Sequence, residues 1–357
     1  MKRLLALFAL LGLTLAAPEV RVLLAKTPAF EVVLEGPHVV FGPFGPLFYR
    51  KEGARYRLER TQKGLLVNGQ FEPTPLSFVP KKGAFVLGGR RYAGFLRVLK
   101  REGELWLVNV VDLEAYVAGV LPGEMPASFP FEALKAQAVL ARTYALEHLA
   151  SHPDYDLCAD ASCQVYRGLV PLDPRYERAI RATKGLLLAY QGSPAKALYH
   201  ADSGGQTAAA LEVWGRDYPY LKSRPDPYTR KKPWRLTPDP ARVAAALKRA
   251  DPGPFRFVVE ATSASGRIAA LRVESPRATY RLAGPEATRF LRAIGLPSTL
   301  AWVKGGRTFV GRGSGHGVGL SQWGARGLAE HGYEWREILG HYFPGTVIAP
   351  FVIRAQR

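Results

Sequence analysis

The chain has 357 residues, 47% of them apolar, and a formal net charge of +19 at pH 7. This apolar content excludes a disordered chain, and the length allows one or two buried cores without disulfides or metals for support. Lys and Arg are scattered, which favours attraction to a polyanion through a general field rather than one groove. For an exported chain this predicts an anionic envelope polymer as partner and no nucleic acid; the alternative is that the charge serves only solubility and stability.

The first 17 residues predict a secretory signal peptide. Lys2 and Arg3 precede an apolar run from Leu4 to Leu15, and two alanines follow it. This run is shorter than the about 20 residues that span a bilayer. We therefore expect residues 1–17 to direct export to the periplasm, the cell envelope or the extracellular space. An uncleaved amino-terminal anchor is the alternative.

Residues 18–100 are predicted to be rich in β-strands. Short apolar or alternating runs are broken by Gly and Pro, as is typical of strands joined by tight turns. The clearest runs are VRVLLA, FEVVLEG, HVVFG, KGLLVNG, AFVLGG and FLRVLK. One more strand is expected at Leu105–Val111, and a strand-like run leads from it to the proline-rich stretch LPGEMPASFP, Leu121–Pro130.

From residue 101 onward, helices and strands are mixed. The clearest helix has apolar residues spaced three or four apart from Phe131 to Leu149, with Ser128 as its N-cap and an end before Pro153. Four more helices are expected in the segments that begin at Asp239, Gly284, Ser321 and Glu334. Strand runs followed by such a mixture predict an α+β fold, with a β-rich region at 18–100 and a mixed domain at 101–357.

Glu124 is the single acid in LPGEMPASFP. Pro122 and Pro126 fix their own φ angles and restrict the residues before them, and Leu121 and Met125 are apolar neighbours. Apolar surroundings favour the neutral form of an acid, which suits a general acid working near neutral pH. The alternative is an ordinary solvent-facing glutamate in a proline turn.

A glycine-rich segment, GRGSGHGVGLSQWGA at Gly311–Ala325, is the second candidate site. It matches neither the dinucleotide fingerprint nor a P-loop, so nucleotide binding is unsupported. Its glycines permit close backbone approach, and His316, Ser321 and Gln322 place polar groups beside them. We interpret it as a ligand-contacting loop; a flexible glycine loop is the alternative.

The segment YHADSGGQT, Tyr199–Thr207, brings His200, Asp202 and Ser203 together. These are the residue types of a hydrolase triad, but adjacency in sequence is not triad geometry, and Ser203 lies in no G-x-S-x-G elbow. A polar loop that lines a cleft is therefore the favoured interpretation.

Cys158 and Cys163 are the two cysteines of the chain. In an exported protein this pair forms either a small disulfide loop or half of a metal site, with His152 upstream as a further ligand. Free thiols are the third alternative.

These motifs together resemble the SpoIID/LytB family, the family of stage II sporulation protein D. The resemblance rests on four segments in the family's order. They are LEAYVAGVLPGEMPASFPFEALKAQAVLARTYAL (Leu113–Leu146), CADASCQVYRG (Cys158–Gly168), YHADSGGQTAAALEVWG running on to PYLKSRPDPY (Tyr199–Tyr228), and GRGSGHGVGLSQWGARGLAEHGYEWREILGHYFPGT (Gly311–Thr346). The resemblance implies a SpoIID-like mixed α/β catalytic domain with a central cleft at 101–357.

The resemblance implies a peptidoglycan lytic transglycosylase acting on glycan strands stripped of stem peptides. Such an enzyme cleaves the β-1,4 bond between N-acetylmuramic acid (MurNAc) and N-acetylglucosamine (GlcNAc) without water and leaves a 1,6-anhydro sugar. The family's catalytic glutamate falls on Glu124, which would protonate the glycosidic oxygen and then deprotonate the muramic C6 hydroxyl. One carboxylate serves both steps, unlike the pair of most glycosidases. A hydrolase pairing Glu124 with Asp112 or Glu114 is a lesser alternative.

The resemblance also implies substrate contacts, a zinc site and partners. The residues on family positions expected to contact the glycan strands are His200, Ser203, His316, Ser321 and Gln322, with Gln164 and Tyr166 beside them. Cysteine-containing members bind zinc through a His/Cys/Cys set, here His152, Cys158 and Cys163, which favours a structural zinc over the disulfide; catalysis requires no cofactor. LytB-type members modify an amidase, so a glycan-binding activator of a cell-wall amidase is the main alternative function.

Overall fold

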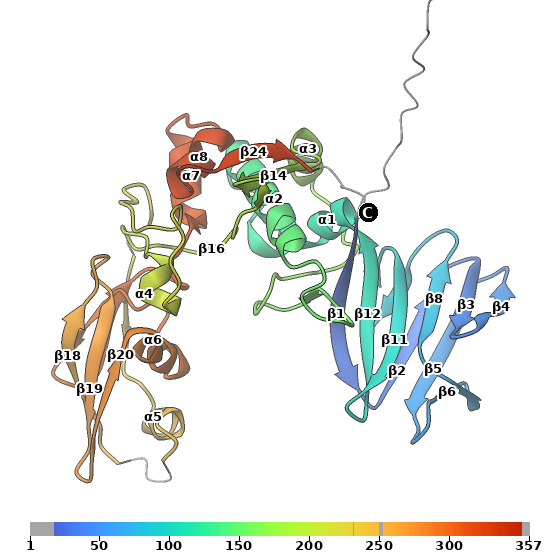
Figure 1. Ribbon diagram of the computed structural model, residues 1–357, viewed down its shortest axis with the longest axis horizontal. Helices are drawn as coiled ribbons and strands as arrows, with labels where there is room; N and C mark the ends of the chain where they lie inside the picture. Colours follow the sequence, from blue (N-terminus) through green and yellow to red (C-terminus); the bar gives the residue numbers. More distant parts are fainter. Residues whose placement is uncertain (1–17, 231, 250–252, 352–357) are drawn as a thin grey trace, which may run out of the picture.

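The computed structural model describes residues 18–230, 232–249 and 253–351, so the predicted signal peptide at 1–17 lies outside the described residues. The chain forms an arch, with two β-sheets at one end, a helical centre and a smaller α/β unit at the other end (Figure 1). This arrangement confirms the predicted α+β class. Within the described ranges, no helix combines the length and apolar character needed to cross a membrane.

The amino-terminal part of the arch consists of two sheets that share one core. The larger sheet has the strand order β13-β1-β12-β11-β8-β3-β4, and the other has the order β10-β9-β2-β5-β6-β7. The strands of the larger sheet are β1 (Glu19–Thr27), β3 (His38–Gly42), β4 (Gly45–Arg50), β8 (Leu76–Pro80), β11 (Phe95–Arg101), β12 (Glu104–Asp112) and β13 (Leu157–Cys158). The strands of the other are β2 (Ala29–Leu34), β5 (Ala54–Arg60), β6 (Leu65–Val67), β7 (Gln70–Glu72), β9 (Phe85–Leu87) and β10 (Arg90–Tyr92).

The six strand runs expected at 18–100 and the strand at Leu105–Val111 are confirmed as β1, β2, β3, β6, β9, β11 and β12. Strands such as β5 were not anticipated because its sequence, ARYRLER, buries only Tyr56 and Leu58 and exposes charged residues on the other face. β12 follows residue 100 in the chain and pairs along its length with both β1 and β11. The sheet therefore continues into the segment that precedes the candidate site.

The segment between β12 and Met125 forms helix α1 (Leu113–Glu124), so the expected strand-like run into LPGEMPASFP was wrong. Its buried residues, among them Tyr116, Val117, Val120 and Leu121, recur with a helical period, but the continuous apolar run concealed that period. Asp112 caps the helix, because its side chain accepts hydrogen bonds from two backbone N–H groups of the first turn. The residues LPGE are therefore the last turn of a helix.

Helix α2 (Phe131–Glu147) lies at the centre of the arch and contacts several neighbouring elements. Its N-cap is Pro130 rather than the expected Ser128, which is exposed. The elements around it are α3 (Pro174–Ala182), β14 (Leu186–Tyr190), β15 (Ser193–Pro194), α7 (Gln322–Glu330), α8 (Trp335–Tyr342) and β24 (Val347–Pro350). The short strands β16 (Tyr199–His200) and β23 (Leu320–Ser321) pair in parallel beside them.

A separate hydrophobic core lies at the far end of the arch. It is formed by residues of the segment that runs from β17 to β22. Its elements are β17 (Pro233–Leu236), α5 (Pro240–Ala246), β18 (Arg256–Thr262), β19 (Ile268–Glu274), β20 (Thr279–Ala283), α6 (Gly284–Ala293), β21 (Ala301–Lys304) and β22 (Thr308–Arg312). Helix α4 (Ala210–Trp214) packs against α6 and joins this unit to the centre. The helices expected to begin near Asp239, Gly284, Ser321 and Glu334 are confirmed as α5, α6, α7 and α8.

Candidate functional site

A cavity of about 530 Å³ lies between the helical centre and the second core. Its walls come from the end of α1, from α2, from the segment after β13, from β16, from α4 and α6, and from the glycine-rich loop. The lining residues are Glu124, Tyr144, Ala161, Ser162, Cys163, Val165, Leu198, Tyr199, His200, Ala201, Trp214, Arg292, Gly315, His316 and Gln322. Glu124 is the one carboxylate among the described residues that line it.

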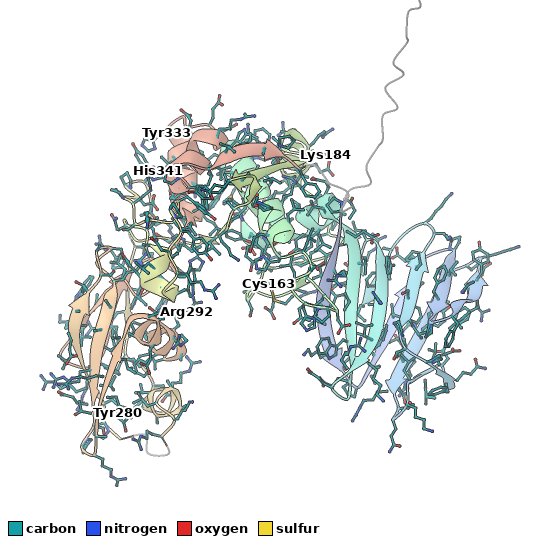
Figure 2. All side chains as sticks on the ribbon, viewed as in Figure 1. Cys163, Lys184, Tyr280, Arg292, Tyr333 and His341 are labelled. Atoms are coloured by element: carbon teal, nitrogen blue, oxygen red, sulfur yellow. A yellow bond between two sulfur atoms is a disulfide. The ribbon has the colours of Figure 1, made fainter. Side chains whose placement is uncertain are left out.

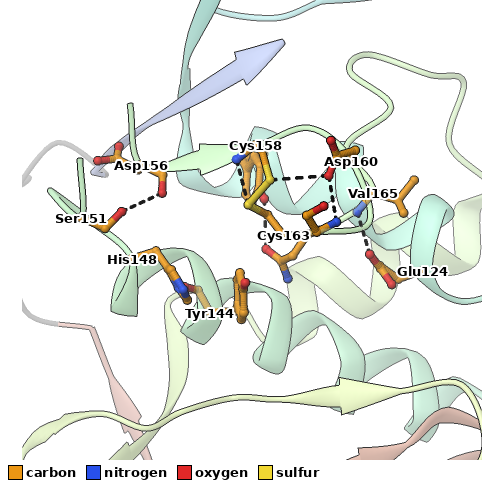
Figure 3. The surroundings of a disulfide bond; sticks show 12 residues. Glu124, Tyr144, His148, Ser151, Asp156, Cys158, Asp160, Cys163 and Val165 are labelled. Carbon is orange, nitrogen blue, oxygen red and sulfur yellow. Dashed lines mark hydrogen bonds between the residues drawn. A yellow bond between two sulfur atoms is a disulfide. The ribbon is translucent and has the colours of Figure 1, made fainter. Parts of the chain in front are cut away.

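Glu124 is the last residue of α1, and three groups hold its carboxylate. The backbone N–H of Val165 donates a hydrogen bond of 2.7 Å to Oε1 (Figure 3). The side chains of Tyr199 and Gln322 lie beside the carboxylate, and each lowers its pKa. Burial nevertheless dominates and raises the pKa of Glu124, although these three polar neighbours act in the opposite direction. The side chain is therefore positioned and favours its protonated form more than a free glutamate does.

Gly123 explains how Val165 reaches the carboxylate. A Cβ at position 123 would overlap the backbone oxygen of Val165 and crowd its side chain. The segment after β13 therefore approaches the last turn of α1 more closely than any larger residue would allow. The glycine next to Glu124 thus belongs to the same arrangement that orients the acid.

Behind the carboxylate, the buried side chains of Tyr116 and Gln164 form a hydrogen-bonded row with the partly buried Tyr199. The hydroxyl of Tyr116 donates to Oε1 of Gln164 at 3.0 Å, and Nε2 of Gln164 donates to the hydroxyl oxygen of Tyr199 at 3.1 Å. The Tyr199 hydroxyl in turn lies beside the Glu124 carboxylate and lowers its pKa. The predicted contact residue Gln164 therefore acts on Glu124 through Tyr199 and does not itself line the cavity.

Tyr166, another predicted contact residue, lies in the core instead. It is buried, its hydroxyl donates to Oδ1 of Asn109 at 2.8 Å, and its ring packs against Tyr92 and Tyr116. Because Tyr166 directly follows Val165, these core contacts hold the backbone of Val165 in place. The ring does not line the cavity.

The predicted contact residues His200 and His316 both line the cavity, with ring centroids 5.4 Å apart. Burial lowers the pKa of His316 to about 4 and the pKa of His200 well below its usual value. Both rings are therefore neutral near pH 7. Nδ1 of His200 bonds to the carbonyl of Val318 at 3.1 Å, whereas its Nε2 is buried without a partner in the described residues. The imidazole therefore lines the wall of the cavity with one polar nitrogen unsatisfied.

The glycine-rich loop holds His316 beside His200 because it lies directly on β16. A Cβ at Gly315 would meet the Cβ of His200 at 2.8 Å, and one at Gly319 would overlap the carbonyl of Leu198. Both glycines also have positive φ angles, 100° and 71°. The loop is therefore tightly packed rather than a flexible linker.

Ser203 and Ser321 are fully buried and do not line the cavity. The hydroxyl of Ser203 donates to Oδ2 of Asp226 at 2.6 Å, so it is not directed at His200, and no triad forms. The hydroxyl of Ser321 accepts from the N–H of Gly324 at 3.2 Å and caps α7. Gln322 follows as the first residue of α7 and does line the cavity.

Asp112 and Glu114 lie too far from Glu124 to serve as the second carboxylate of a hydrolase. Asp112 caps the start of α1, and Glu114 lies in the first turn, whereas Glu124 ends the helix. At a rise of about 1.5 Å per residue these acids lie roughly 15 to 18 Å from Glu124 along the axis. Paired glycosidase carboxylates are about 5 to 10 Å apart.

The zinc assignment is corrected, because Cys158 and Cys163 form a disulfide bond (Figure 3). Sulfur atoms bonded to each other are not thiolate ligands, so the expected set does not fit zinc. His152 instead stacks on Tyr155, and its Nδ1 accepts from the N–H of Asp154 at 3.1 Å. No cluster of His, Cys, Asp and Glu suited to a metal occurs among the residues that the structure describes. The disulfide alternative is the one observed.

Four residues that line the cavity are not among the contacts expected from the sequence. They are Tyr144, Tyr199, Trp214 and Arg292. The first three lie inside or beside the four sequence motifs, and Tyr199 directly precedes His200. Arg292 belongs to α6, whose sequence gives no indication of proximity to Glu124. Cys163 and Arg292 face the inner side of the arch from its centre and its far part, respectively (Figure 2).

Fold and cavity together define an α+β protein in which one half-buried carboxylate lies among polar side chains, two neutral histidines and one arginine. The profile of the SpoIID family, stage II sporulation protein, matches residues 101–190. Stage II sporulation protein D of Bacillus subtilis is 32% identical over 264 residues, 68% of this chain and 76% of its own length. An uncharacterized protein of Brachyspira hyodysenteriae is 32% identical over 281 residues, 75% and 74% of the two chains.

The amidase enhancer of Bacillus subtilis is 30% identical over 288 residues, 65% of this chain but 40% of its own length. The chain belongs to the stage II sporulation protein D family and is a cell-wall-related protein of the SpoIID/LytB type.

Proposed function

We propose that this protein is an exported lytic transglycosylase that cleaves the MurNAc–GlcNAc β-1,4 bond of peptide-stripped glycan strands, with Glu124 as acid and then base. The observation that carries the proposal is the one carboxylate among the described residues that line the cavity, half-buried, bonded by the N–H of Val165 and flanked by Tyr199 and Gln322. Catalysis requires no cofactor in this proposal. The net charge of +19 supports attraction to anionic envelope polymers.

The first step needs Glu124 protonated, which burial favours. The proton moves to the glycosidic oxygen as the bond from that oxygen to C1 of MurNAc breaks, and GlcNAc leaves as an alcohol. In the second step the Glu124 carboxylate takes the proton of the C6 hydroxyl, and the C6 oxygen bonds to C1. The 1,6-anhydro sugar forms, and Glu124 is again protonated, so one carboxylate completes the cycle.

The neighbouring groups have supporting roles. The hydrogen bond from Val165 and the adjacent Tyr199 hydroxyl keep the carboxylate within reach of two substrate oxygens in turn. The neutral rings of His200 and His316 line the cavity without competing with Glu124 as acids. We assign substrate contact to these two histidines and to Gln322.

The decisive experiment is product analysis by mass spectrometry after incubation with peptide-free glycan strands. Wild-type protein is expected to release 1,6-anhydromuramyl products, and Glu124→Gln is expected to release none. Glu330→Gln, an exposed substitution on α7, serves as the matched control and should retain activity. Reducing ends that carry oxygen from isotopically labelled water would instead indicate a hydrolase.

A second candidate function is the binding of glycan to activate a cell-wall amidase. The similarity to the amidase enhancer of Bacillus subtilis favours it, although that relative is much longer. In this case glycan strands would stay uncut, and a purified amidase would be stimulated equally by wild type and Glu124→Gln. Stimulation together with anhydro products would show that both activities coexist.

A further inference from the structure

Arg292 is the one cationic side chain among the described residues that line the Glu124 cavity. It is exposed, and within the described chain its guanidinium forms no hydrogen bond or ion pair. With His200 and His316 both neutral, it is also the one fixed positive charge in this lining set. An unpaired guanidinium in the wall of this cavity suits an anionic group on the substrate.

Arg292 lies where the cavity continues into a second one. That cavity, about 540 Å³, is lined by Val213, Trp214, Pro285, Thr288, Arg289, Arg292 and Ala293. Trp214 and Arg292 line both cavities. A chain-like ligand that leaves Glu124 on this side therefore passes these two residues.

Trp214 supplies an aromatic surface at this junction. It ends α4, remains 41% exposed, and has its ring centroid 5.1 Å from that of His316. Arg292 is near the same imidazole, because its charge contributes to the lowered pKa of His316 after burial. The three side chains thus form one cluster, with an exposed ring and a free cation on its outer side.

The fold explains why these side chains face the ligand path. Helix α6 buries Ala287, Phe290 and Leu291 in the second core and leaves Arg289 and Arg292 exposed, three residues apart on one face. Because α4 packs on α6, Trp214 and Arg292 are brought together although they are far apart in sequence. Figure 2 shows Arg292 on the inner side of the arch.

We propose that Trp214 and Arg292 form a subsite for a sugar that carries a free carboxylate, adjacent to the sugars on which Glu124 acts. The indole would pack against the ring face of the sugar, and the guanidinium would donate to the carboxylate. This rests on the proposed function. In peptidoglycan such a sugar is MurNAc whose lactyl group carries no stem peptide, so Arg292 is the residue that selects peptide-free strands.

The test measures binding in the Glu124→Gln background, so that no turnover occurs. Two probes are compared by calorimetry: a tetrasaccharide of alternating GlcNAc and MurNAc with free lactyl carboxylates, and the same tetrasaccharide with neutral lactyl methylamides. We expect the carboxylate probe to bind about tenfold more tightly, as one charge-assisted hydrogen-bonded pair provides. Adding Arg292→Ala should remove this preference, and Arg292→Lys should retain part of it.

Two further variants separate the roles of ring and charge. Trp214→Ala should weaken both probes equally, because stacking does not depend on the carboxylate. Arg307→Ala, in the exposed turn between β21 and β22, is the matched control and should change neither affinity. Thermal melting of each variant confirms folding.

A carboxylate preference that persists in Arg292→Ala, an equal loss for both probes in that variant, or no binding of either probe would overturn the subsite. This binding test is independent of the product analysis that tests the transglycosylase activity. A wild-type protein that cuts no glycan but shows the Arg292-dependent preference would refute the transglycosylase proposal and leave the subsite in place.

Discussion

The backbone N–H of Val165 lies 2.7 Å from Oε1 of Glu124 and connects the end of α1 to the disulfide-closed segment. Val165 comes two residues after Cys163, which itself lines the cavity. The acid is thus oriented by a main-chain group whose position depends on a covalent loop closure, on Gly123 and on buried aromatic contacts. The disulfide, the glycine and the aromatic contacts can each be changed by a separate substitution.

Burial raises the pKa of Glu124, so folding stability should depend on its titration. A raised folded-state pKa means that the native state binds this proton more tightly than the unfolded state does. The resulting contribution is present below the unfolded value, near 4.5, and is lost as pH rises through the folded value. Glu124→Gln, which stays neutral, should therefore gain melting temperature relative to wild type as pH rises through this window. A constant difference would contradict the raised pKa.

Tyr199→Phe should shift the pH dependence of turnover. The Tyr199 hydroxyl lies beside Glu124 and lowers its pKa, opposing burial, so its removal raises that pKa further. We expect the alkaline limb of kcat/KM to move to higher pH, while turnover at the optimum falls because the carboxylate is less well oriented. A shift of the limb to lower pH would refute this effect of Tyr199 on the pKa of Glu124. Exposed Tyr333→Phe is the control.

Gly123→Ala should impair activity although alanine favours helices. In an exposed helix this exchange stabilises by up to about 1 kcal/mol. Here the added methyl group would overlap the backbone of Val165 and displace the hydrogen bond to Glu124. Turnover and melting temperature are both expected to fall. Gly340→Ala in α8, where nothing lies near the added carbon, should leave turnover unchanged and raise the melting temperature slightly.

Replacing both Cys158 and Cys163 by serine should lower stability by about 2 kcal/mol, the chain-entropy value for a short closed loop. Turnover should fall further than this loss explains, because Val165 adjoins the loop. Denaturant unfolding and product release measure the two effects. Thiol titration of the unfolded wild type should find no free thiol before reduction and two after it; two thiols before reduction would overturn the disulfide.

Arg142→Ala should destabilise the protein by about 3 to 5 kcal/mol, the usual effect of removing one partner of a buried ion pair. The fully buried guanidinium binds Glu114 through two hydrogen bonds of 2.7 and 2.8 Å and donates to the carbonyl of Leu186. It therefore joins α1, α2 and β14. Arg142→Lys should recover only part of the loss. Arg55→Ala, which breaks an exposed pair with Glu31, should have a far smaller effect in the same unfolding experiment.

Sequence patterns predict seven strands of the amino-terminal sheets (β1, β2, β3, β6, β9, β11 and β12) and the helices α2 and α5 to α8, because each has an apolar period or recognisable turn residues. They failed for α1, where burial on most sides removes the polar face that identifies a helix. Among the candidate contacts, a motif does not separate a ligand-facing side chain from a buried one. Tyr166 and Ser321 therefore proved to be structural, whereas His200, His316 and Gln322 line the cavity.

Arg292 could not be anticipated for a different reason. Its helix belongs to the second hydrophobic core, and its approach to Glu124 depends on the packing of α4 on α6. Such a contact between separately packed units has no local sequence signal. Tyr199 lies within a motif, but adjacent residues of a strand point to opposite sides, and the sequence does not show which of Tyr199 and His200 lies beside the acid.

β12 leads directly into α1, and β13 extends the same sheet beside β1. The segment that ends in Glu124 therefore follows β12, and the segment that carries Val165 follows β13. These two strands lie on either side of β1 in one sheet. A chain shortened to residue 101 onward would lose β1 and β11, the two partners of β12, and would leave β13 unpaired. The amino-terminal sheet therefore positions both segments that form the site. Exchange of this region between relatives would preserve function only if the new region supplied a strand equivalent to β1.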